Sequence, residues 1–356
     1  MPAPLEIDKS QGNYFKFGDM SERSSPLKLE AREIRDWNSE LIVEANRRLW
    51  TVAFPSTFSQ LLAEATMSSN MLFVSWLNDP LQTAGAGLAM IYINFTTQSV
   101  LTGLNSALAV LVAVSFGQQD NRHCAMLLQR GRLICFLIFV SLFVLVLFSY
   151  RAMITLGVSE AVAGYGYEYA FIMYFSMGFH SQFDCYRQYL NSTNQSRVVK
   201  YTVLVTLIFH LCALYLVTRV FQLGIKGVAI AYLMTCILNF LIVMVYVWKY
   251  AEYRVHPFRF KFKKLLKIEY VKVYMKLAAP SIALVCAQWW AIEILQLLAT
   301  RLSVVAVGCM AITTSFMNVT NQFPVALNIG ATSVIGNVIG EGDRQLSKVV
   351  AVLAFV

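Results

Sequence analysis

Two long stretches of the chain contain no charged side chain. Residues 80–119 and 302–340 each run for about 40 positions without Asp, Glu, Lys or Arg, which is longer than the ~20 residues that one transmembrane helix needs. Two shorter stretches, 133–149 and 227–248, are also free of charge. Hydrophobic residues make up 57% of the chain and charged residues only 14%, a composition that is unusual for a soluble domain. The chain is therefore predicted to be an all-α polytopic membrane protein.

Periodicity and helix breakers predict eight membrane helices, and the charges between them predict their orientation. With a cytoplasmic N-terminus, the inner loops hold 17 Lys and Arg, Arg130 and Arg132 among them, and the outer loops hold 4. Such a bias fixes the topology of membrane proteins. It also explains the net charge of +9, which gives no reason to expect a nucleic-acid partner. The predicted helices cover residues 49–72, 84–112, 126–149, 163–185, 198–218, 227–249, 274–300 and 305–335, and a ninth begins near Ser347.

Matching motifs indicate an internal repeat. Pro55 opens the first helix and Pro280 the seventh, 225 positions later, while Gly117 and Gly340 end the charge-free runs that follow, 223 positions apart. Because the repeat contains six helices, both copies begin on the same side of the membrane, which predicts two parallel six-helix lobes. A second lobe of equal length would extend beyond Val356. We therefore interpret the chain as an incomplete transporter, with one complete lobe, helices 7 and 8, and the start of helix 9.

The predicted organisation has four parts. Residues 1–48 form a cytoplasmic tail, in which residues 26–48 are either an amphipathic helix on the inner membrane surface or a plain lead-in helix. The N-terminal six-helix lobe covers residues 49–250, a basic cytoplasmic linker covers 251–273, and a partial C-terminal lobe covers 274–356. The seven cysteines lie in or beside predicted spans without metal-ligand spacing, so we interpret them as small apolar helix residues.

One acidic residue, Glu293, stands alone in the uncharged stretch 277–300. An ionisable group at this depth is costly unless it is paired, hydrated or protonated, and such groups often take part in ion pathways. A buried carboxyl can load and release a proton in the physiological range, and a proton and a cationic substrate then compete for it. The neighbouring Trp289 and Trp290 provide ring faces for a cation. Trp289 shares a helix face with Glu293 and is the preferred candidate, although simple packing explains both tryptophans equally well, and Glu293 could be a structural carboxyl.

Other polar or helix-breaking residues in the predicted spans are weaker candidates. Glu64, nine positions after Pro55, is the second candidate for cation or proton coupling, and it either faces a central cavity or pairs with a basic or amide group. Gln60 and Asn70 flank it, and they either bind substrate or make helix–helix contacts. Pro280 and Pro324 interrupt helices 7 and 8 and serve either as hinges or as fixed kinks.

Further candidates lie in helices 4 and 5. Asp184 and Arg187, three residues apart near the inner end of helix 4, are expected to form an ion pair. His210 in helix 5 is either a proton relay or a core histidine whose nitrogens are satisfied by neighbours.

Several short sequence motifs, found in both halves of the chain, point to the same family. The most specific is the string from Gln288 through Trp289 and Trp290 to Glu293. It is accompanied by Leu277-Ala278-Ala279-Pro280-Ser281, Pro324, Gly336-Asn337-Val338-Ile339-Gly340, Gly103-Leu104-Asn105-Ser106-Ala107, Phe116-Gly117, Gln129-Arg130-Gly131, Arg187 with Tyr189-Leu190, and Gly224-Ile225-Lys226-Gly227-Val228-Ala229. Over residues 40–356 the chain resembles the multidrug and toxic compound extrusion transporters, eukaryotic branch. The resemblance implies twelve helices in two lobes and export of organic, often cationic, compounds by exchange with protons or sodium.

Four positions depart from the family pattern. A second Glu is usual where Gln288 stands, and bacterial relatives often carry an Asp at the position of Asn70. Val334 and Val114 occupy positions where an arginine and a glutamine are common. The resemblance therefore places ion coupling on Glu293 and weakens the case for a first-lobe acid.

The predicted function is secondary-active antiport, not enzymatic catalysis. We expect export of organic cations or amphipathic xenobiotics in exchange for protons, sodium being the alternative ion, by rocking of two lobes around a central cavity. The partners expected are a small organic substrate and membrane lipid, with a monomer in the plasma membrane or an intracellular vesicle and no cofactor. The alternatives are a lipid or lipid-linked sugar flippase, a truncated inactive transporter, and a seven-helix receptor, which the charge bias opposes.

Overall fold

The computed structural model describes residues 39–250, 265, 267–302 and 304–354, and the regular elements in these residues are helices joined by short turns. The predicted tail over residues 1–38 and most of the predicted linker, residues 251–264, lie outside this range. In chain order the elements are α2 (Ser39–Ser75), α3 (Pro80–Ile93), the π-helix η2 (Asn94–Gln98), α4 (Ser99–Gly117), α5 (Asn121–Leu147), α6 (Ser149–Thr155), α7 (Glu160–Ser192), α8 (Ser196–Tyr215), the π-helix η3 (Leu216–Val220), α9 (Gly224–Tyr250), α11 (Ile268–Leu302), α12 (Val304–Glu341) and α13 (Arg344–Leu353).

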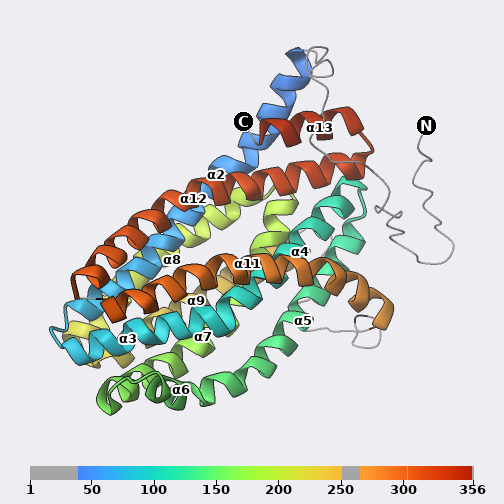
Figure 1. Ribbon diagram of the computed structural model, residues 1–356. Coiled ribbons are helices and arrows are strands. Elements are labelled where there is room, and N and C mark those ends of the chain that lie inside the picture. Colours follow the sequence, from blue (N-terminus) through green and yellow to red (C-terminus); the bar gives the residue numbers. More distant parts are fainter. Residues whose placement is uncertain (1–38, 251–264, 266, 303, 355–356) are drawn as a thin grey trace.

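The eight predicted membrane helices are all present, and the long rods run side by side (Figure 1). The second predicted helix is one continuous rod made of α3, η2 and α4, and the fifth is made of α8 and η3. Six of the helices are long and apolar enough to cross a membrane, whereas α2 and α7 do not reach that hydropathy. Both of these bury many polar side chains, which lowers their hydropathy without exposing charge to lipid.

Arg130 and Arg132 do not lie in an inner loop as expected. Both are buried within α5, which begins at Asn121. The Arg130 Nε donates to the Leu265 carbonyl at 3.2 Å, and the Arg132 Nε donates to Gln182 Oε1 at 3.1 Å. These partners allow the two guanidinium groups to be buried, because each replaces a lost hydrogen bond to water.

The internal repeat is visible in the backbone at the ends of α4 and α12. Asp120 caps α5 by accepting from the His123 amide at 2.8 Å, and Asp343 caps α13 by accepting from the Leu346 amide at 3.0 Å. The residue before each aspartate has positive φ, 59° at Gln119 and 85° at Gly342. The two turns have an aspartate cap and a left-handed residue at equivalent places, 223 positions apart, as the internal repeat predicts.

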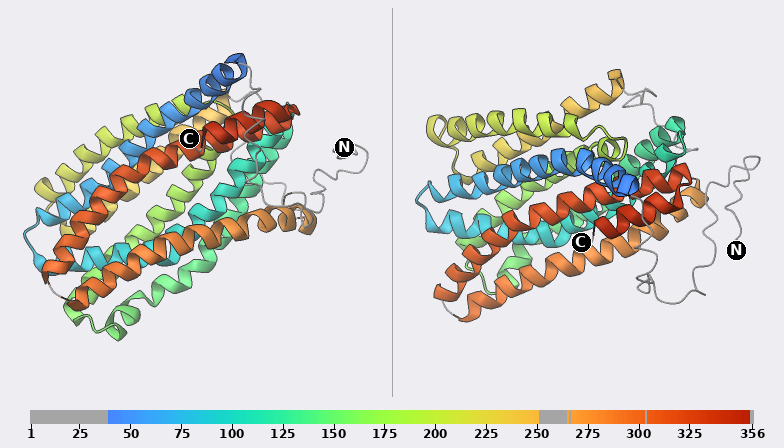
Figure 2. Two further views of the ribbon diagram at one scale, coloured as in Figure 1. Left: turned by 45° about the horizontal axis from the view of Figure 1, so that its top comes forward. Right: turned by 90° about the horizontal axis from the view of Figure 1, so that it is seen from above.

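The helices α2 to α9 form the first lobe, and α11 to α13 belong to the second. In the first lobe α7 is the central helix, with α3, α4, α5 and α9 packed around it. The second-lobe helices pack against one face of this bundle. The helix α12 runs alongside α2 and α4, and α11 runs alongside α4 (Figures 1 and 2).

At one end of the bundle, near Gly117 and Gly340, the two lobes are in backbone contact. A Cβ added to Gly117 would lie 1.9 Å from the Asn337 carbonyl oxygen, and one added to Gly340 would lie 2.3 Å from the Val114 carbonyl oxygen. Only glycine permits such an approach of two helices. The Ser333 hydroxyl also donates to the Asn191 carbonyl at 2.8 Å. We call this contact, formed by α4 and the end of α7 against α12, the inner seal, because the charge bias of the sequence predicts that it lies on the inner side.

Candidate functional site

Glu293 lies on α11, where that helix faces the π-helix η2 of the first lobe. Its side chain is buried, with 8% exposure. The Asn94 Nδ2 donates to Glu293 Oε1 at 3.0 Å, while Oε2 is buried without a hydrogen-bond partner among the described residues. A buried acidic group with one unsatisfied oxygen is costly, and it is suited to hold a proton or to receive a cationic group.

The π-helix explains why the two lobes meet at this point. In η2 the Ser99 amide donates to the Asn94 carbonyl, so it no longer satisfies the Phe95 carbonyl as it would in an α-helix. The Trp290 Nε1 of α11 donates to that carbonyl at 2.9 Å, and the Ser99 hydroxyl donates to it at 3.3 Å. The rings of Phe95 and Trp290 also stack, with centroids 4.4 Å apart. One turn of irregular helix thus positions Trp290, and with it Glu293, against the first lobe.

The residues of the string from Gln288 to Glu293 differ in how far they are exposed. Gln288 is exposed and Trp289 is half-buried. Trp290 is the tryptophan that contacts the first lobe, although Trp289 was preferred from its shared face with Glu293. Because α11 presents Trp290 and Glu293 three residues apart, both can reach the same neighbouring helix.

Glu64 also lies where the two lobes meet. It is a half-buried residue of α2, and the Gln322 Nε2 of α12 donates to its Oε2 at 3.2 Å. Gln322 is fixed by a second bond from the same nitrogen to the Asn318 carbonyl at 3.0 Å. Of the two readings that the sequence left open for Glu64, the structure shows pairing with an amide group.

Gln60 belongs to a different, fully first-lobe network. Asp184 and Arg187 form the expected ion pair on α7, with Nη2 and Oδ1 2.5 Å apart. Arg187 Nη1 donates to Gln60 Oε1, and the Asn105 Nδ2 of α4 donates to Asp184 Oδ2 at 2.8 Å. Gln60 is therefore engaged in a helix–helix contact, which was the alternative to substrate binding.

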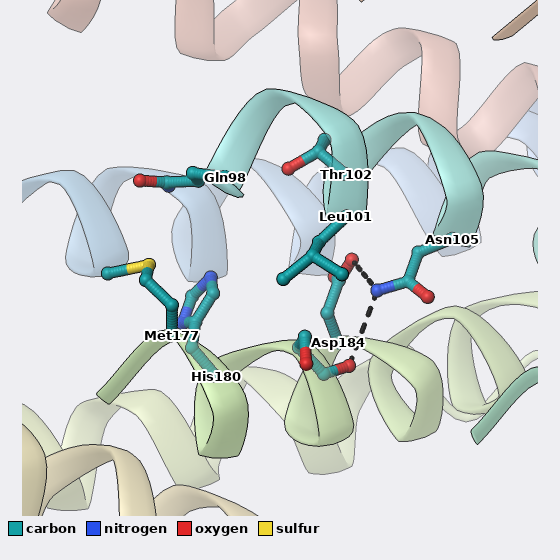
Figure 3. A pocket seen from close by; sticks show the side chains of 8 residues that line it. Gln98, Leu101, Thr102, Asn105, Met177, His180 and Asp184 are labelled. Carbon is teal, nitrogen blue, oxygen red and sulfur yellow. Dashed lines mark hydrogen bonds between the residues drawn. The ribbon is translucent and has the colours of Figure 1, made fainter. Parts of the chain in front are cut away.

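A small pocket adjoins this network between η2–α4 and α7 (Figure 3). In Figure 3 the Asn105 amide reaches down from α4 towards α7, where it bonds the Asp184 carboxylate and a backbone carbonyl. His180 and Met177 stand beside them on α7. The pocket is lined by Gln98, Leu101, Thr102, Asn105, Met177, His180, Ser181 and Asp184.

The remaining candidates do not converge on Glu293. Asn70 is completely buried on α2, and neither of its side-chain polar atoms has a hydrogen-bond partner among the described residues. His210 is buried, and its Nδ1 shares a 2.8 Å hydrogen bond with the Thr235 hydroxyl. Pro280 and Pro324 lie inside α11 and α12, and both helices continue through them.

Asn94 and Gln322 were missed from the sequence alone. Both are amides in charge-free stretches, where neither composition nor spacing distinguishes them from other polar helix residues. Metal-binding residues do not gather in the described part of the chain, where three or more His, Cys, Asp or Glu side chains nowhere come together.

Taken together, the apolar rods, the repeated lobes and the buried acids between them define a multi-pass helical membrane protein of the transporter class. The family model named MatE matches residues 55–216 and 280–356. The chain therefore belongs to the MATE family of transporters, which are not enzymes.

Curated relatives include plant and animal proteins. The chain is 27% identical over 342 residues to Protein DETOXIFICATION 51 of Arabidopsis thaliana, covering 93% of this chain and 62% of that protein. It is 24% identical over 353 residues to the Multidrug and toxin extrusion protein 1 of Oryctolagus cuniculus, covering 98% of this chain and 58% of that protein. The chain thus spans about three fifths of the length of these relatives.

Solved structures share the fold at lower identity. The crystal structure of the eukaryotic MATE transporter AtDTX14 has a TM-score of 0.81 at 18% identity, over 88% of this chain and 70% of that one. A MOP superfamily transporter from Pyrococcus furiosus has a TM-score of 0.78 at 13% identity, over 87% of this chain and 68% of that one. These likenesses confirm the predicted all-helical fold.

Proposed function

We propose that the chain is part of a secondary-active antiporter that exports organic cations or amphipathic xenobiotics in exchange for protons, with sodium as the alternative ion. The observation that carries this proposal is Glu293, buried at the contact between the lobes with one oxygen bonded to Asn94 and the other unsatisfied. The names of relatives in the family, such as Multidrug and toxin extrusion protein 1, agree with the proposed class of substrate.

The chemistry of Glu293 provides the exchange. When the carboxyl is ionised it attracts a cation, and when it carries a proton it does not, so that the two ligands exclude each other. One carboxylate is enough to hold a proton, whereas sodium prefers several oxygen ligands, as other hard cations do. The residues proposed to contact substrate are Gln288, Trp289 and Trp290, with Gln60 and Asn70 as weaker candidates.

The proposed conformational cycle is rocking of one lobe against the other. The inner seal closes the cytoplasmic end, so substrate leaves to the outside when the lobes stand as they do in this structure. Pro280 and Pro324 are proposed as hinges, because a proline removes a backbone hydrogen bond and allows a helix to bend.

The placement of the protein in the membrane is proposed from the charges. We propose a monomer with a cytoplasmic N-terminus, a first lobe over residues 49–250 and a second-lobe portion over residues 274–356, in contact with membrane lipid. The alternative flippase would need free basic side chains for a phosphate headgroup. The two arginines buried in α5, Arg130 and Arg132, instead bond to Leu265 and Gln182.

The test is efflux of a fluorescent organic cation from vesicles, with pH and sodium gradients imposed separately. Replacement of Glu293 by Gln removes the titratable proton and keeps the side-chain volume, so we expect gradient-driven efflux to be lost while insertion is retained. The matched control is Glu160→Gln, because Glu160 is an exposed acid at the start of α7. Full pH-driven efflux in the Glu293→Gln protein would falsify the coupling role.

A further inference from the structure

Asn337 of α12 lies within the inner seal, where its side chain is buried. The amide is assigned the orientation that satisfies both of its polar atoms. In this orientation the nitrogen donates to the Ala113 carbonyl of α4 at 2.7 Å and to the Ser192 carbonyl of α7 at 3.2 Å. One side chain of the second lobe therefore bonds to two separate helices of the first lobe.

Ser333, one turn before Asn337 on α12, extends this contact to the end of α7. Its hydroxyl donates to the Asn191 carbonyl at 2.8 Å. Because α7 ends at Ser192, the carbonyls of Asn191 and Ser192 belong to its last turn, where a helix has no donors of its own left for its carbonyls. Two side chains of the second lobe thus cap the C-terminus of a helix in the first lobe.

The side chain of Asn191 is a group in the same place that favours opening. It is 2% exposed, and neither of its polar atoms has a hydrogen-bond partner among the described residues. A buried amide without partners is costly, and water that entered between the lobes would satisfy it. The donors of Asn337 therefore hold the seal closed against the unsatisfied amide of Asn191, so that a change in either residue shifts the equilibrium between the closed and the open seal.

We infer that Asn337 is the latch of the inner seal, a positioning residue that sets how often the seal opens and acts without contact with the substrate. This inference rests on the rocking of the lobes in the proposed function. When the seal opens, the amide leaves the Ala113 and Ser192 carbonyls and water takes its place. Loss of the two donors should therefore increase the population of the open seal while the fold of each lobe is retained.

The experiment measures the opening of the seal with a thiol placed at Val338. This residue follows Asn337, is completely buried and belongs to the apolar cluster that joins α12 to α2. The purified full chain carries Val338→Cys together with Cys212→Ser and Cys309→Ser, which remove the exposed thiols. A water-soluble maleimide is added, and the labelled peptides are measured by mass spectrometry. Cys236, buried in the first lobe on α9, reports general loosening.

We expect Asn337→Ala to raise the labelling rate at position 338 about tenfold, because the seal then opens without the loss of two hydrogen bonds. Labelling of Cys236 should stay the same. Asn337→Asp keeps the size of the side chain and removes the NH₂ donor, so it should give the same rise. The control Asn328→Ala removes an exposed amide from the same helix and should give none. Asn191→Leu removes the unsatisfied amide and should lower the labelling rate.

Three results would overturn the inference. They are an unchanged labelling rate in a folded Asn337→Ala protein, a rate in Asn337→Asp equal to that of the unchanged chain, and equal rises at position 338 and at Cys236. The second result would mean that packing closes the seal, and the third that the whole protein loosens. Efflux from vesicles separates the two proposals. Gradient-driven efflux by a chain in which Asn337→Ala leaves the labelling unchanged removes only the latch, whereas no efflux by the unchanged chain under either gradient removes the proposed function.

Discussion

The inner seal predicts a large effect from the smallest substitution available to a glycine. In Gly117→Ala the new methyl group would lie 1.9 Å from the Asn337 carbonyl oxygen, whereas ordinary contacts begin at 3.4 Å. The helices α4 and α12 would therefore have to move apart by about 1.5 Å. Overpacking of this kind costs ~1–3 kcal/mol, and at roughly 2–4 °C per kcal/mol the melting temperature should fall by about 2–12 °C.

The chain supplies both the probe and the control for this measurement. Five of its cysteines are buried, so a thiol-reactive fluorophore that labels them on unfolding reports the melting in detergent without introduced cysteines. Gly164 on α7 has nothing within 4 Å of a built Cβ, and Gly164→Ala should leave stability unchanged or raise it by ~0.5–1 kcal/mol through helix propensity. Equal melting temperatures for Gly117→Ala and Gly164→Ala would show that α4 and α12 do not approach as described.

Further predictions concern the two ends of the contact between the lobes. Trp290→Phe keeps an aromatic ring at this position and removes the N–H donor to the Phe95 carbonyl. We expect it to lower the free energy of unfolding by ~0.5–1.5 kcal/mol, whereas Trp289→Phe should not. Equal melting curves for the two variants would contradict the role of the Phe95 carbonyl. At the other end, hydrogen bonds from Arg47 and Arg48 lower the pKa of Glu44 from 4.5 to about 2. A depressed folded-state pKa stabilises the protein above pH 4.5, and this stabilisation is lost as the pH falls towards 2. Because these groups are exposed, the loss should stay below ~1 kcal/mol. Melting curves recorded at acid pH should show the loss in the unchanged chain and not in Glu44→Gln.

Much of the fold could be predicted because its signals are local or periodic. Charge-free runs define the spans, and the counts of Lys and Arg define their orientation, since each depends only on composition. The offset between Pro55 and Pro280 predicted the two lobes, and the matching turns at Gln119 and Gly342 confirm the repeat. The short helix α6 was not predicted, because it contains Arg151, which the charge count placed in an outer loop after the end of the third helix.

The partners of the acids could not be predicted from the same signals. Which residue faces Glu293 depends on how α3 is rotated against α11, and the π-turn at Asn94 changes that rotation by adding a residue to one turn. The contact of Trp290 with Phe95 could not be predicted for the same reason, because a face shared on one helix does not say where the neighbouring helix lies.

Because of the π-helix η2, the docking of the second lobe depends on the number of residues in one helical turn. The Phe95 carbonyl is available to Trp290 because the Ser99 amide reaches back five positions instead of four. If one residue were deleted from this turn, ordinary helical bonding would be restored, the carbonyl would be occupied by its own helix, and the indole would lose its acceptor. The register of a single turn thus decides whether α11 has a place to bind, even with every side chain of the interface retained.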